Sequence, residues 1–365
     1  ARDPRTGALV GLPDILYVGE GMNESVAVSD DRESRLFSVS GKVEASTART
    51  DMRLQRMLGD LPALLHPGPR SALIVGFGAG VTSGCFVQYP SIRRIVICEL
   101  EPLVPKVVGP YFDAANHGVV HDPRVEIVYD DARHFMLTSR EKFDIITSDP
   151  IHPWVKGSAV LYSKDYFDLV RRHLNPGGLV TQWLPLYQAS EATIQGEIAT
   201  FFAAFPGGSV WANNDDKGRG YDMVLLGGPG AGPIDLDSLD ARYRSPGYAG
   251  VAASLGAIGC GSAFDLLATY AGRHADLAPW LEGARINDDH QLWLQYQAAL
   301  ETFTEDEGPI FEHLSQYRSF PQDLFTGSAA MRQRMLAGGA APAGAAAGTP
   351  IPEHVPVAAP TTHRR

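Results

Sequence analysis

Short apolar runs rich in valine and isoleucine alternate with helical patterns from residue 71 onward, and most of them have glycine or an acidic residue at the last position or the one before it. The runs are SALIVGF (71–77), RRIVICEL (93–100), RVEIVYDD (124–131), FDIITSD (143–149), GLVTQWL (178–184) and DMVLLGG (222–228). A strand that is apolar along its whole length is buried on both faces, as in a parallel sheet between two layers of helices. The pattern therefore predicts an α/β fold built on a doubly wound, Rossmann-like parallel sheet.

The segments around these runs divide the chain into four parts. Residues 1–66 are expected to form an N-terminal β module and a connecting helix, and residues 67–230 the Rossmann-like domain. Residues 231–336 have mostly helical patterns and are expected to form an accessory segment. Residues 337–365 repeat Ala, Pro and Gly, a composition that cannot bury a core and predicts a disordered tail.

The N-terminal module contains two short alternating segments, ESVAVSD and RLFSVSG. Their alternation predicts strands with Val26 and Val28 on one face and Phe37 and Val39 on another. An amphipathic helix with leucines at helical spacing follows, and Pro67 is expected to stop it.

Composition restricts the partners and the compartment. A formal net charge of −11 over 365 residues disfavours nucleic acid as a partner and suits a small cationic substrate such as an amine. Three cysteines without CxxC spacing predict reduced thiols and a cytoplasmic location. No apolar run approaches the roughly 18 residues that span a bilayer. The chain opens on ARDPRTG without a Met, so it can be a piece of a longer protein.

Three glycines, Gly76, Gly78 and Gly80, follow the first apolar run in the sequence VGFGAG. Glycines allow a sharp turn and a close approach of the backbone to a ligand, and the next helix offers unpaired N–H groups. Such turns also occur for packing alone, so the position after the first strand carries the argument. Glu99 ends the next run, where a carboxylate can accept both hydroxyl hydrogens of a ribose. Its alternative role is a solvated acid at a strand end.

Two more acids stand at the ends of the third and fourth runs. Asp131 is placed to accept a hydrogen bond from the amino group of an adenine, a role that a nicotinamide-binding fold does not require. It can also cap the following helix. Asp149 precedes a proline, which holds it in an extended conformation. There it can bind a cationic amine and remove its proton, because only a neutral nitrogen can attack the carbon beside a sulfonium. The four strand ends therefore predict a site for a sulfonium nucleoside of the S-adenosylmethionine type.

Over about residues 20–230, the segments taken in order resemble the spermidine synthase (polyamine aminopropyltransferase) family. The segments are GKVEAST, MLGDLPALLHPGP, LIVGFGAGVTSG, ICELEP, HDPRVEIVYDDAR, FDIITSDPIHPW and LYSKDYFDLVRRHLNPGGLVTQW. They look closest to the branch in which such a domain is fused to membrane segments of a transporter-like protein. The resemblance implies a class I methyltransferase-type fold with a small N-terminal β domain and, in this chain, a mostly helical C-terminal extension.

The resemblance also implies roles for the residues at the strand ends. The glycine turn that includes Ala79 would hold the nucleoside, and Glu99 would bind its ribose. Asp131 would bind the adenine amino group, and Asp149 would be the catalytic acid that accepts the proton of the amine.

Three positions depart from the family pattern. The Asp of the glycine loop, which pairs with the free amine of the decarboxylated nucleoside, is Ala79 here. The second acid after the strand-four Asp is replaced by His152, and a Gln near the end of the β module by Glu44. A buried ammonium without an acidic partner is costly, so the usual substrate pair does not follow. We expect Glu44, His152, Trp154 and Tyr187 to line the substrate pocket, with cation–π attraction from the aromatic rings. Packing at a domain junction is the alternative role of Trp154 and Tyr187, and a loop histidine that packs on Trp154 is the alternative for His152.

Three functions remain open from the sequence. The first is transfer of an aminopropyl group from decarboxylated S-adenosylmethionine to an amine acceptor. The second is a methyltransferase that uses S-adenosylmethionine itself, because Ala79 removes a carboxylate that would repel the methionine carboxylate. The third is a non-catalytic regulatory domain that binds a nucleoside or a polyamine. A nicotinamide dehydrogenase shares the glycine turn and Glu99 but leaves Asp131 and Asp149 without a purpose.

The remaining expectations concern metals, assembly and a C-terminal motif. No metal site is expected, because His117, His121 and His134 lack the spacing of metal ligands. The family implies a homo-oligomer, and the fused branch implies a tether to a membrane region outside this chain, with the domain on the cytoplasmic side. The segment INDDHQLWLQY (286–296) resembles a C-terminal element of the fused branch but receives no role from the sequence.

Overall fold

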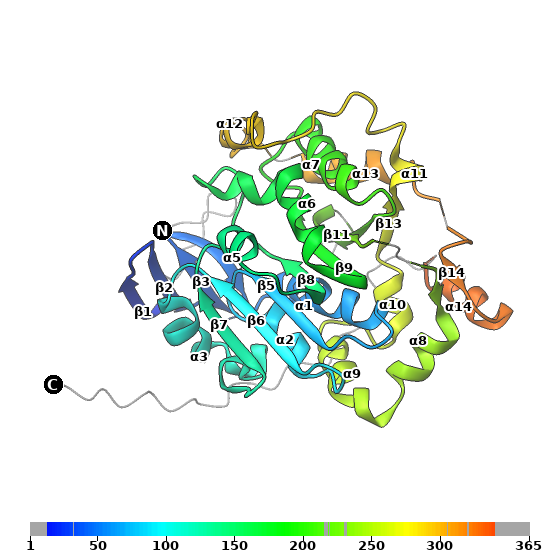
Figure 1. Cartoon of the computed structure of the whole chain (residues 1–365), viewed down its shortest axis with the longest axis horizontal. Helices are drawn as coiled ribbons and strands as arrows, with labels where there is room; N and C mark the ends of the chain where they lie inside the picture. The colour runs from blue at the N-terminus through cyan, green and yellow to red at the C-terminus, as the bar shows by residue number, and fades with distance from the viewer. Residues whose placement is uncertain are drawn as a thin grey trace.

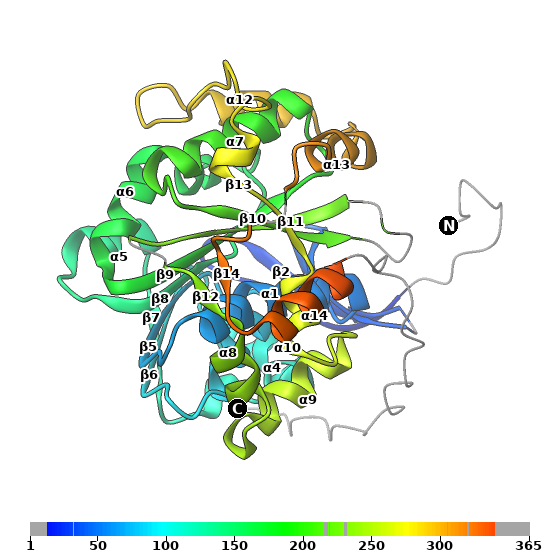
Figure 2. The ribbon, with the colours of Figure 1, turned by 90° about the vertical axis from the view of Figure 1, so that its right-hand side faces the viewer.

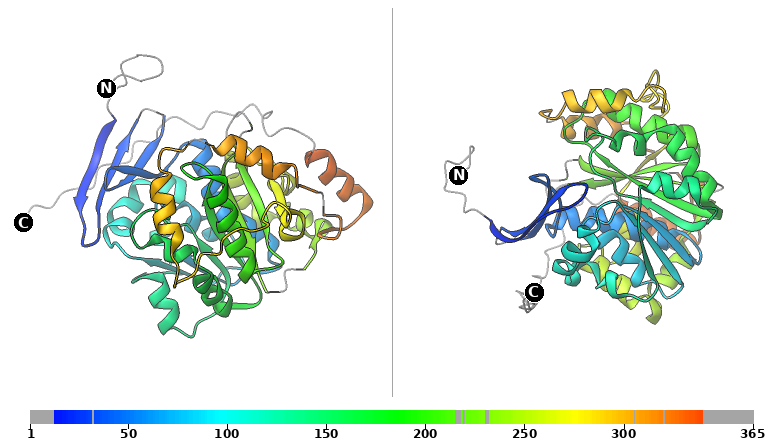
Figure 3. Two further views of the ribbon diagram at one scale, coloured as in Figure 1. Left: turned by 90° about the horizontal axis from the view of Figure 1, so that it is seen from above. Right: turned by 60° about the vertical axis from the view of Figure 1, so that its left-hand side comes forward.

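The computed structural model describes residues 13–31, 33–214, 218, 220–229, 232–304, 306–319 and 321–339. An antiparallel N-terminal sheet comes first in the chain and lies at one end of the molecule (Figure 3). Its strands, in sheet order, are β1 (Asp14–Glu20), β2 (Ser25–Asp30), β3 (Arg35–Val39) and β4 (Lys42–Ser46). The sheet is followed by α1 (Arg49–Leu65), which leads into the main domain.

The two apolar pairs of this sheet share one face, which corrects the sequence expectation of two faces. Val26 lies directly opposite Val39 and Val28 directly opposite Phe37 in the β2–β3 register. Residues directly opposite each other on antiparallel strands point to the same side. All four are buried in the apolar cluster that also contains the buried face of α1.

A second, mixed sheet forms the centre of the molecule (Figure 1). Eight of the described strands belong to it, in the order β13-β10-β11-β9-β8-β5-β6-β7. Their bounds are β5 (Ser71–Val75), β6 (Arg94–Glu99), β7 (Val125–Tyr129), β8 (Phe143–Ser148), β9 (Leu174–Pro185), β10 (Ser209–Asn214), β11 (Gly220–Gly227) and β13 (Tyr270–Arg273).

The parallel pairing expected for the run DMVLLGG is wrong, because three of the eight described strands, β11, β10 and β13, are antiparallel to their neighbours. Strands β5 to β9 pair in parallel, whereas β11 pairs antiparallel to β9, β10 to β11 and β13 to β10. A strand buried on both faces is apolar throughout whatever its direction, so the run DMVLLGG carries no signal of its orientation. The reversal brings the first residues of β11 to the edge at which β5 to β9 end.

Helices cover both faces of the central sheet (Figure 2). One apolar cluster joins the sheet to α1, α2 (Val81–Val87), α8 (Leu236–Tyr243), α9 (Ala249–Ala257) and α10 (Ala263–Leu267). The other joins it to α5 (Ala132–Thr138), α6 (Lys164–His173), α7 (Glu191–Ala204), α11 (His274–Leu277) and α13 (Glu307–Ser315).

Shorter elements complete the described structure. The helical ones are α3 (Gly109–Tyr111), α4 (Asp113–Asn116), α12 (Trp293–Leu300) and α14 (Ala329–Gly339), with a π-helical turn η1 (Val104–Val108) and 3₁₀ turns η2 (Val119–His121), η3 (Ser158–Tyr162) and η4 (Pro246–Tyr248). Strands β12 (Ile234–Asp235) and β14 (Phe325–Thr326) form a small parallel pair. No helix in the described ranges is long and apolar enough to cross a membrane.

A proline inside α1 fixes this helix against the central sheet. Pro62 has no N–H group, so the carbonyl of Leu58 receives no hydrogen bond from the next turn. Instead, the hydroxyls of Thr147 on β8 and Thr181 on β9 donate to that carbonyl, at 3.3 and 2.8 Å. The hydrogen bond that Pro62 cannot donate is thus replaced by two hydrogen bonds from β8 and β9. These two strands also carry site residues at their ends.

The C-terminal segment differs from its helical expectation in three places. Strand β13 lies within it and extends the central sheet, which the sequence pattern did not indicate. Residues 284–292 are not helical, and α12 begins only at Trp293. The helix α14 continues to Gly339, three residues beyond the start of the expected tail; the rest of the tail lies outside the described residues.

Candidate active site

The carboxyl ends of β5, β6, β7 and β8 meet at one edge of the central sheet, because these strands are parallel neighbours. Ligands of open α/β sheets bind at this edge. The glycine turn follows β5, Glu99 ends β6, Asp131 follows β7 and Asp149 follows β8. The topology therefore brings the four predicted strand ends to one side of the molecule.

The glycine turn lies directly against the end of β8. Gly76, Gly78 and Gly80 all have positive φ angles, of 86°, 55° and 79°. A Cβ at Gly76 would lie 3.3 Å from the Asp149 carbonyl oxygen, and the Asp149 N–H donates to the Val75 carbonyl at 3.3 Å. At Gly78, by contrast, a Cβ would meet no described atom within 4 Å. The turn thus exposes its backbone beside Asp149, as close approach of a ligand requires.

Ala79 contributes backbone rather than an exposed side chain to this turn. Its methyl group is fully buried in the apolar cluster on the α1 side of the sheet. Its carbonyl accepts a hydrogen bond of 3.0 Å from the Asn116 side chain, which also donates to the Gly109 carbonyl at 3.0 Å. These two hydrogen bonds hold the Ala79 carbonyl, and with it the backbone of the turn, to Asn116.

The Glu99 carboxylate is held by the backbone around it. It accepts hydrogen bonds of 2.8 Å from the N–H of Phe77, in the glycine turn, and 2.8 Å from the N–H of Glu101. Burial raises the pKa of Glu99, and these backbone donors oppose the rise. A carboxylate oxygen can accept more than one hydrogen bond, so Glu99 can still accept hydrogen bonds from the hydroxyls of a ligand.

Asp131 caps the helix α5, which was its alternative role. It is exposed, and its Oδ1 accepts a hydrogen bond of 2.9 Å from the His134 N–H. The neighbouring Asp130 accepts from the His134 ring at 2.7 Å. Capping uses one oxygen of Asp131, which leaves the carboxylate able to serve a ligand as well.

Asp149 lies beside the glycine turn and is near enough to Asp51 and Glu44 for their charges to act on it. Its Oδ2 accepts a hydrogen bond of 3.3 Å from the hydroxyl of Thr82, in the first turn of α2. Burial raises the pKa of Asp149 to about 7, with further increases from the negative charges of Asp51 and Glu44. A carboxyl group with a pKa near neutrality can exchange a proton with a substrate at ordinary pH.

The predicted substrate-pocket residues meet around His152, which is only 3% exposed. The His152 ring centroid lies 5.6 Å from that of Trp154 and 5.3 Å from that of Tyr187. Its Nδ1 is 3.6 Å from the Glu44 carboxylate, which comes from β4 of the N-terminal sheet. The structure thus brings these four residues together, whereas Asp131 stands apart from them at the end of β7.

Three charged residues beside this pocket were missed by the sequence analysis: Lys42, Asp51 and Asp222. Lys42 stands two positions before Glu44, and its Nζ lies 2.6 Å from His152 Nδ1. Asp51 accepts a hydrogen bond of 2.5 Å from the Ser46 hydroxyl. A period of two on β4 was an available signal for Lys42, since it places that residue on the same side as Glu44.

Asp222 reaches the pocket because β11 is antiparallel. It lies opposite Pro185, the last residue of β9, and is 1% exposed. The Trp183 indole donates to its Oδ1 at 2.9 Å. Burial raises the pKa of Asp222 to about 8, and the charges of Asp51 and Asp149 add to the rise. An acidic residue within an apolar strand was the signal that could have identified it.

The charges of the pocket are therefore predominantly negative. Burial raises the pKa values of Asp51, Asp149 and Asp222. The negative charges of Asp51 and Glu44 add to the rise at Asp149, and those of Asp51 and Asp149 add to the rise at Asp222. Aromatic rings enclose them, including Tyr187 stacked on Tyr221 at 4.8 Å between centroids. Carboxylates and aromatic faces in one enclosed site are the groups that bind ammonium ions.

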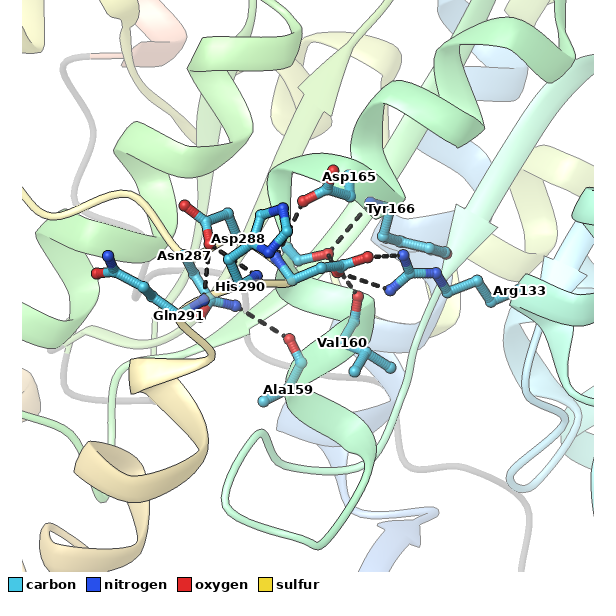
Figure 4. Close-up of polar contacts among 11 residues, drawn as sticks. Arg133, Ala159, Val160, Asp165, Tyr166, Asn287, Asp288, His290 and Gln291 are labelled. Atoms are coloured by element: carbon cyan, nitrogen blue, oxygen red, sulfur yellow. Dashed lines mark hydrogen bonds and ion pairs between the residues drawn. The ribbon is translucent and has the colours of Figure 1, made fainter.

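The segment 286–292 fastens the loop between β8 and α6, which carries His152 and Trp154. Asn287 is fully buried and donates a hydrogen bond of 3.1 Å to the Ala159 carbonyl (Figure 4). It also donates one of 3.1 Å to the Tyr162 carbonyl. Asp289 accepts from the Ser163 hydroxyl at 2.9 Å and pairs with the Arg133 guanidinium. The motif that had no role in the sequence thus joins the pocket loop to α5, the helix that Asp131 caps.

Metal and disulfide chemistry find no support in the described part of the chain. No group of three or more His, Cys, Asp or Glu side chains there has the geometry to hold a metal ion. The three cysteines are buried and unpaired, and burial raises the pKa of each thiol, Cys98 and Cys260 to about 12.

Residues 51–202 match the family described as spermine/spermidine synthase domain, which confirms the family resemblance drawn from the sequence. The chain is 28% identical to the polyamine aminopropyltransferase of Aeropyrum pernix, over 60% of this chain and 71% of the relative. It is 30% identical to that of Nitrosomonas europaea, over 51% of this chain and 58% of the relative. For polyamine aminopropyltransferase 1 of Pseudomonas aeruginosa the identity is 32%, over 43% and 54%. The chain thus spans little more than half the length of two of these relatives.

Solved structures with the same fold carry related names. The spermidine synthase of Thermotoga maritima superimposes with a TM-score of 0.54 at 19% identity, over 63% of this chain and 77% of that protein. A spermidine synthase in complex with the transition state analogue AdoDATO gives a TM-score of 0.53 at 18% identity, with the same coverage. These likenesses confirm the predicted methyltransferase-type fold with its N-terminal β sheet. The resemblance to a transporter-fused branch stays a prediction.

Proposed function

We propose that this chain, whose residues 51–202 form a spermine/spermidine synthase domain, transfers an aminopropyl group from decarboxylated S-adenosylmethionine to an amine. One observation carries the proposal: Asp149 lies against the glycine turn, and its pKa is raised to about 7 by burial and by the nearby charges of Asp51 and Glu44. A nucleoside at the turn and a cationic amine at the acids would meet at this residue. The names of the relatives point to the same reaction.

The proposed nucleoside site uses the ends of three strands. The backbone of the glycine turn would approach the nucleoside, and Glu99, held by two backbone N–H groups, would accept the ribose hydroxyl hydrogens. Asp131 would accept a hydrogen bond from the adenine amino group through the carboxylate oxygen that capping does not use. The Phe77 N–H links the turn to Glu99, so the two parts of this site are fixed relative to each other.

The proposed reaction is a single displacement. The acceptor binds as an ammonium ion and gives one proton to Asp149, whose carboxylate becomes a neutral carboxyl group. The freed nitrogen lone pair attacks the aminopropyl carbon bound to the sulfonium, the C–N bond forms and the C–S bond breaks. The electron pair of that bond returns to sulfur, and methylthioadenosine leaves as a neutral thioether. A base with a pKa near 7 can take the proton and release it to solvent afterwards.

The proposed acceptor is a small amine, bound by the pocket around His152. Asp51 and Asp222 would balance the positive charge, while Trp154 and Tyr187 would enclose the alkyl part and offer their ring faces. We also propose a cytoplasmic location, since buried, unpaired thiols suit a reducing compartment. A homo-oligomer and a membrane tether outside this chain stay predictions from the resemblance.

The test is a product analysis with purified protein. Incubation with decarboxylated S-adenosylmethionine and a panel of amines should release methylthioadenosine and give an acceptor that is heavier by one aminopropyl group, both measured by mass spectrometry. A parallel incubation with S-adenosylmethionine separates the methyltransferase alternative, which would give S-adenosylhomocysteine instead. Asp149→Asn serves as the inactive control. Nucleoside binding without turnover by the wild type, across the whole panel, would contradict the proposal and favour the regulatory alternative.

A further inference from the structure

The ammonium group of Lys42 lies in the pocket proposed for the acceptor amine. Its Nζ is 2.6 Å from His152 Nδ1 and 3.4 Å from the Glu44 carboxylate. The same atom stands 4.8 Å from the centre of the Trp154 ring. A lone pair, a carboxylate and an aromatic face are the contacts by which proteins bind a free alkylammonium ion. The chain thus supplies a cation of its own to one end of the pocket.

The protonation of His152 follows from this contact. An ammonium group only donates hydrogen bonds, so the Nδ1 that faces it must accept through its lone pair, which requires a neutral ring. Burial lowers the pKa of His152, and the positive charge of Lys42 lowers it further, against the opposing effect of Glu44. Neutral His152 therefore adds no positive charge of its own, and Lys42 neutralises Glu44.

Asp149 and Asp222, at the other end of the pocket, have no ion-pair partner among the described cations. Burial is the largest cause of the raised pKa values of Asp149 and Asp222. The negative charges of Asp51 and Glu44 add to the rise at Asp149, those of Asp51 and Asp149 add to the rise at Asp222, and no described cation is among the causes. The pocket is thus divided: its end at β4 is already neutralised by Lys42, and its end at the strand tips is not. One ammonium group has a place beside Asp149, and a second one at the β4 end would meet Lys42.

We propose that Lys42 fills the outer ammonium position of the pocket and thereby restricts the acceptor to amines with one cationic group. This inference rests on the proposed function, because it assigns the acceptor class of the same site. A diamine that reached from Asp149 toward Glu44 would have to displace Lys42 or stand beside a like charge, which disfavours it strongly. A bound monoamine would place its ammonium group beside Asp149 and only its uncharged alkyl chain near Trp154 and Tyr187.

Calorimetric titration tests this preference without requiring turnover. Butylamine and 1,4-diaminobutane are titrated into the wild-type protein, into Lys42→Met, which removes the charge at nearly equal length, and into Lys42→Arg, which keeps it. Lys164→Met is the matched control, because Lys164 pairs with Asp168 on the surface of α6. All titrations contain saturating methylthioadenosine.

The wild type is expected to bind butylamine at least about tenfold more tightly than the diamine. Lys42→Met should bind the diamine about tenfold or more better than the wild type does, with little change for butylamine, whereas Lys42→Arg and Lys164→Met should behave as the wild type. Equal or tighter binding of the diamine by the wild type overturns the inference, as does the absence of binding by either amine. The wild-type comparison decides even if Lys42→Met does not fold.

Transfer assays on the same proteins separate this inference from the proposed function. If Lys42→Met binds the diamine more tightly than the wild type does but no protein transfers an aminopropyl group to any amine, the role of Lys42 is supported and the proposed transferase function is contradicted. Transfer to the diamine as efficient as to butylamine in the wild type would retain the transferase and reject the role of Lys42.

Discussion

The hydroxyl of Thr82 donates a hydrogen bond of 3.3 Å to the carboxylate of Asp149, and so connects the helix after the glycine turn to the acid at the end of β8. The backbone makes the same connection, since the Asp149 N–H donates to the Val75 carbonyl before the turn. Asp149 is thus positioned by the element proposed to hold the nucleoside. Its distance from the reacting sulfonium is therefore set by the same short stretch of chain.

Asp149→Asn should lower the rate of transfer by about a hundredfold or more, because the amide cannot accept the proton of the amine. Binding of methylthioadenosine should change little, since that site uses other strand ends. Asp168→Asn is the matched control, because Asp168 pairs with the cations of Lys164 and Arg171 on the surface of α6. Stopped-time assays of methylthioadenosine release, combined with calorimetric binding, distinguish the two effects. Equal rates for Asp149→Asn and Asp168→Asn would exclude Asp149 as the base.

The pH dependence follows from the pKa of Asp149, which burial raises to about 7. The ionised form is the base, so kcat/KM for the amine should rise about tenfold per pH unit below this value and level off above it. A bound ammonium favours the ionised carboxylate, so the corresponding limb of kcat should lie at lower pH. Initial rates from pH 5 to 9 at saturating nucleoside measure both limbs. An acid limb that is unchanged in position between kcat/KM and kcat would contradict this account.

Amine binding should release a proton from Asp222. Burial raises the pKa of Asp222 to about 8, so the side chain is mostly protonated at pH 7, and a cation brought beside it lowers that pKa and expels the proton. Titrations at pH 7 in two buffers of different ionisation enthalpy count the protons released. The wild type should release more protons per amine bound than Asp222→Asn, which cannot ionise. The same count in both proteins would argue that Asp222 does not face the bound cation.

Asp289→Asn should loosen the pocket loop. The Asp289 carboxylate pairs with Arg133 and accepts from the Ser163 hydroxyl, and an amide retains only part of these contacts. Amide hydrogen exchange in residues 157–163 should accelerate by about tenfold, while exchange in β2 to β4 stays unchanged. Exchange measured by mass spectrometry, with Asp168→Asn as the comparison, tests the claim that residues 286–292 fasten this loop. Unaltered exchange in residues 157–163 would show that they do not.

Thr181→Val should destabilise the fold by about 1–2 kcal/mol in urea unfolding at nearly constant side-chain volume. The change removes the hydrogen bond of 2.8 Å to the Leu58 carbonyl, which Pro62 leaves without an N–H partner from within α1. Thr138→Val is the control, because Thr138 is exposed and its hydroxyl donates to the carbonyls of His134 and Phe135 in its own helix. An equal decrease in the free energy of unfolding for both variants would mean that the hydrogen bond between Thr181 and α1 does not stabilise the fold more than an exposed one.

The strand ends were predictable because parallel strands deliver their last residues to one edge. The spacing of apolar runs located Gly76, Glu99, Asp131 and Asp149, and the structure places all four at that edge. Asp222 could not be placed this way. It begins β11, and only the antiparallel direction of that strand sets it opposite Pro185 at the site. Direction leaves no trace in a run that is apolar on both faces.

The pocket around His152 was predictable only in part. Glu44 and His152 drew attention as departures from a family pattern, but nothing local in the sequence pairs β4 with the loop after β8. Their contact, and that of Lys42, depends on how the N-terminal sheet docks on the main domain, which involves residues more than 100 positions apart. Long-range packing of this kind is set by the whole buried surface rather than by any single segment.

A crystal structure of the protein grown with methylthioadenosine tests the central claim most directly. The account predicts adenosine density along the ends of β5 to β8, with the ribose hydroxyls at Glu99, the adenine amino group at Asp131 and the sulfur beside Asp149. Density at another place on the molecule, or side chains of Glu99 and Asp149 that face separate cavities in the complex, would contradict it.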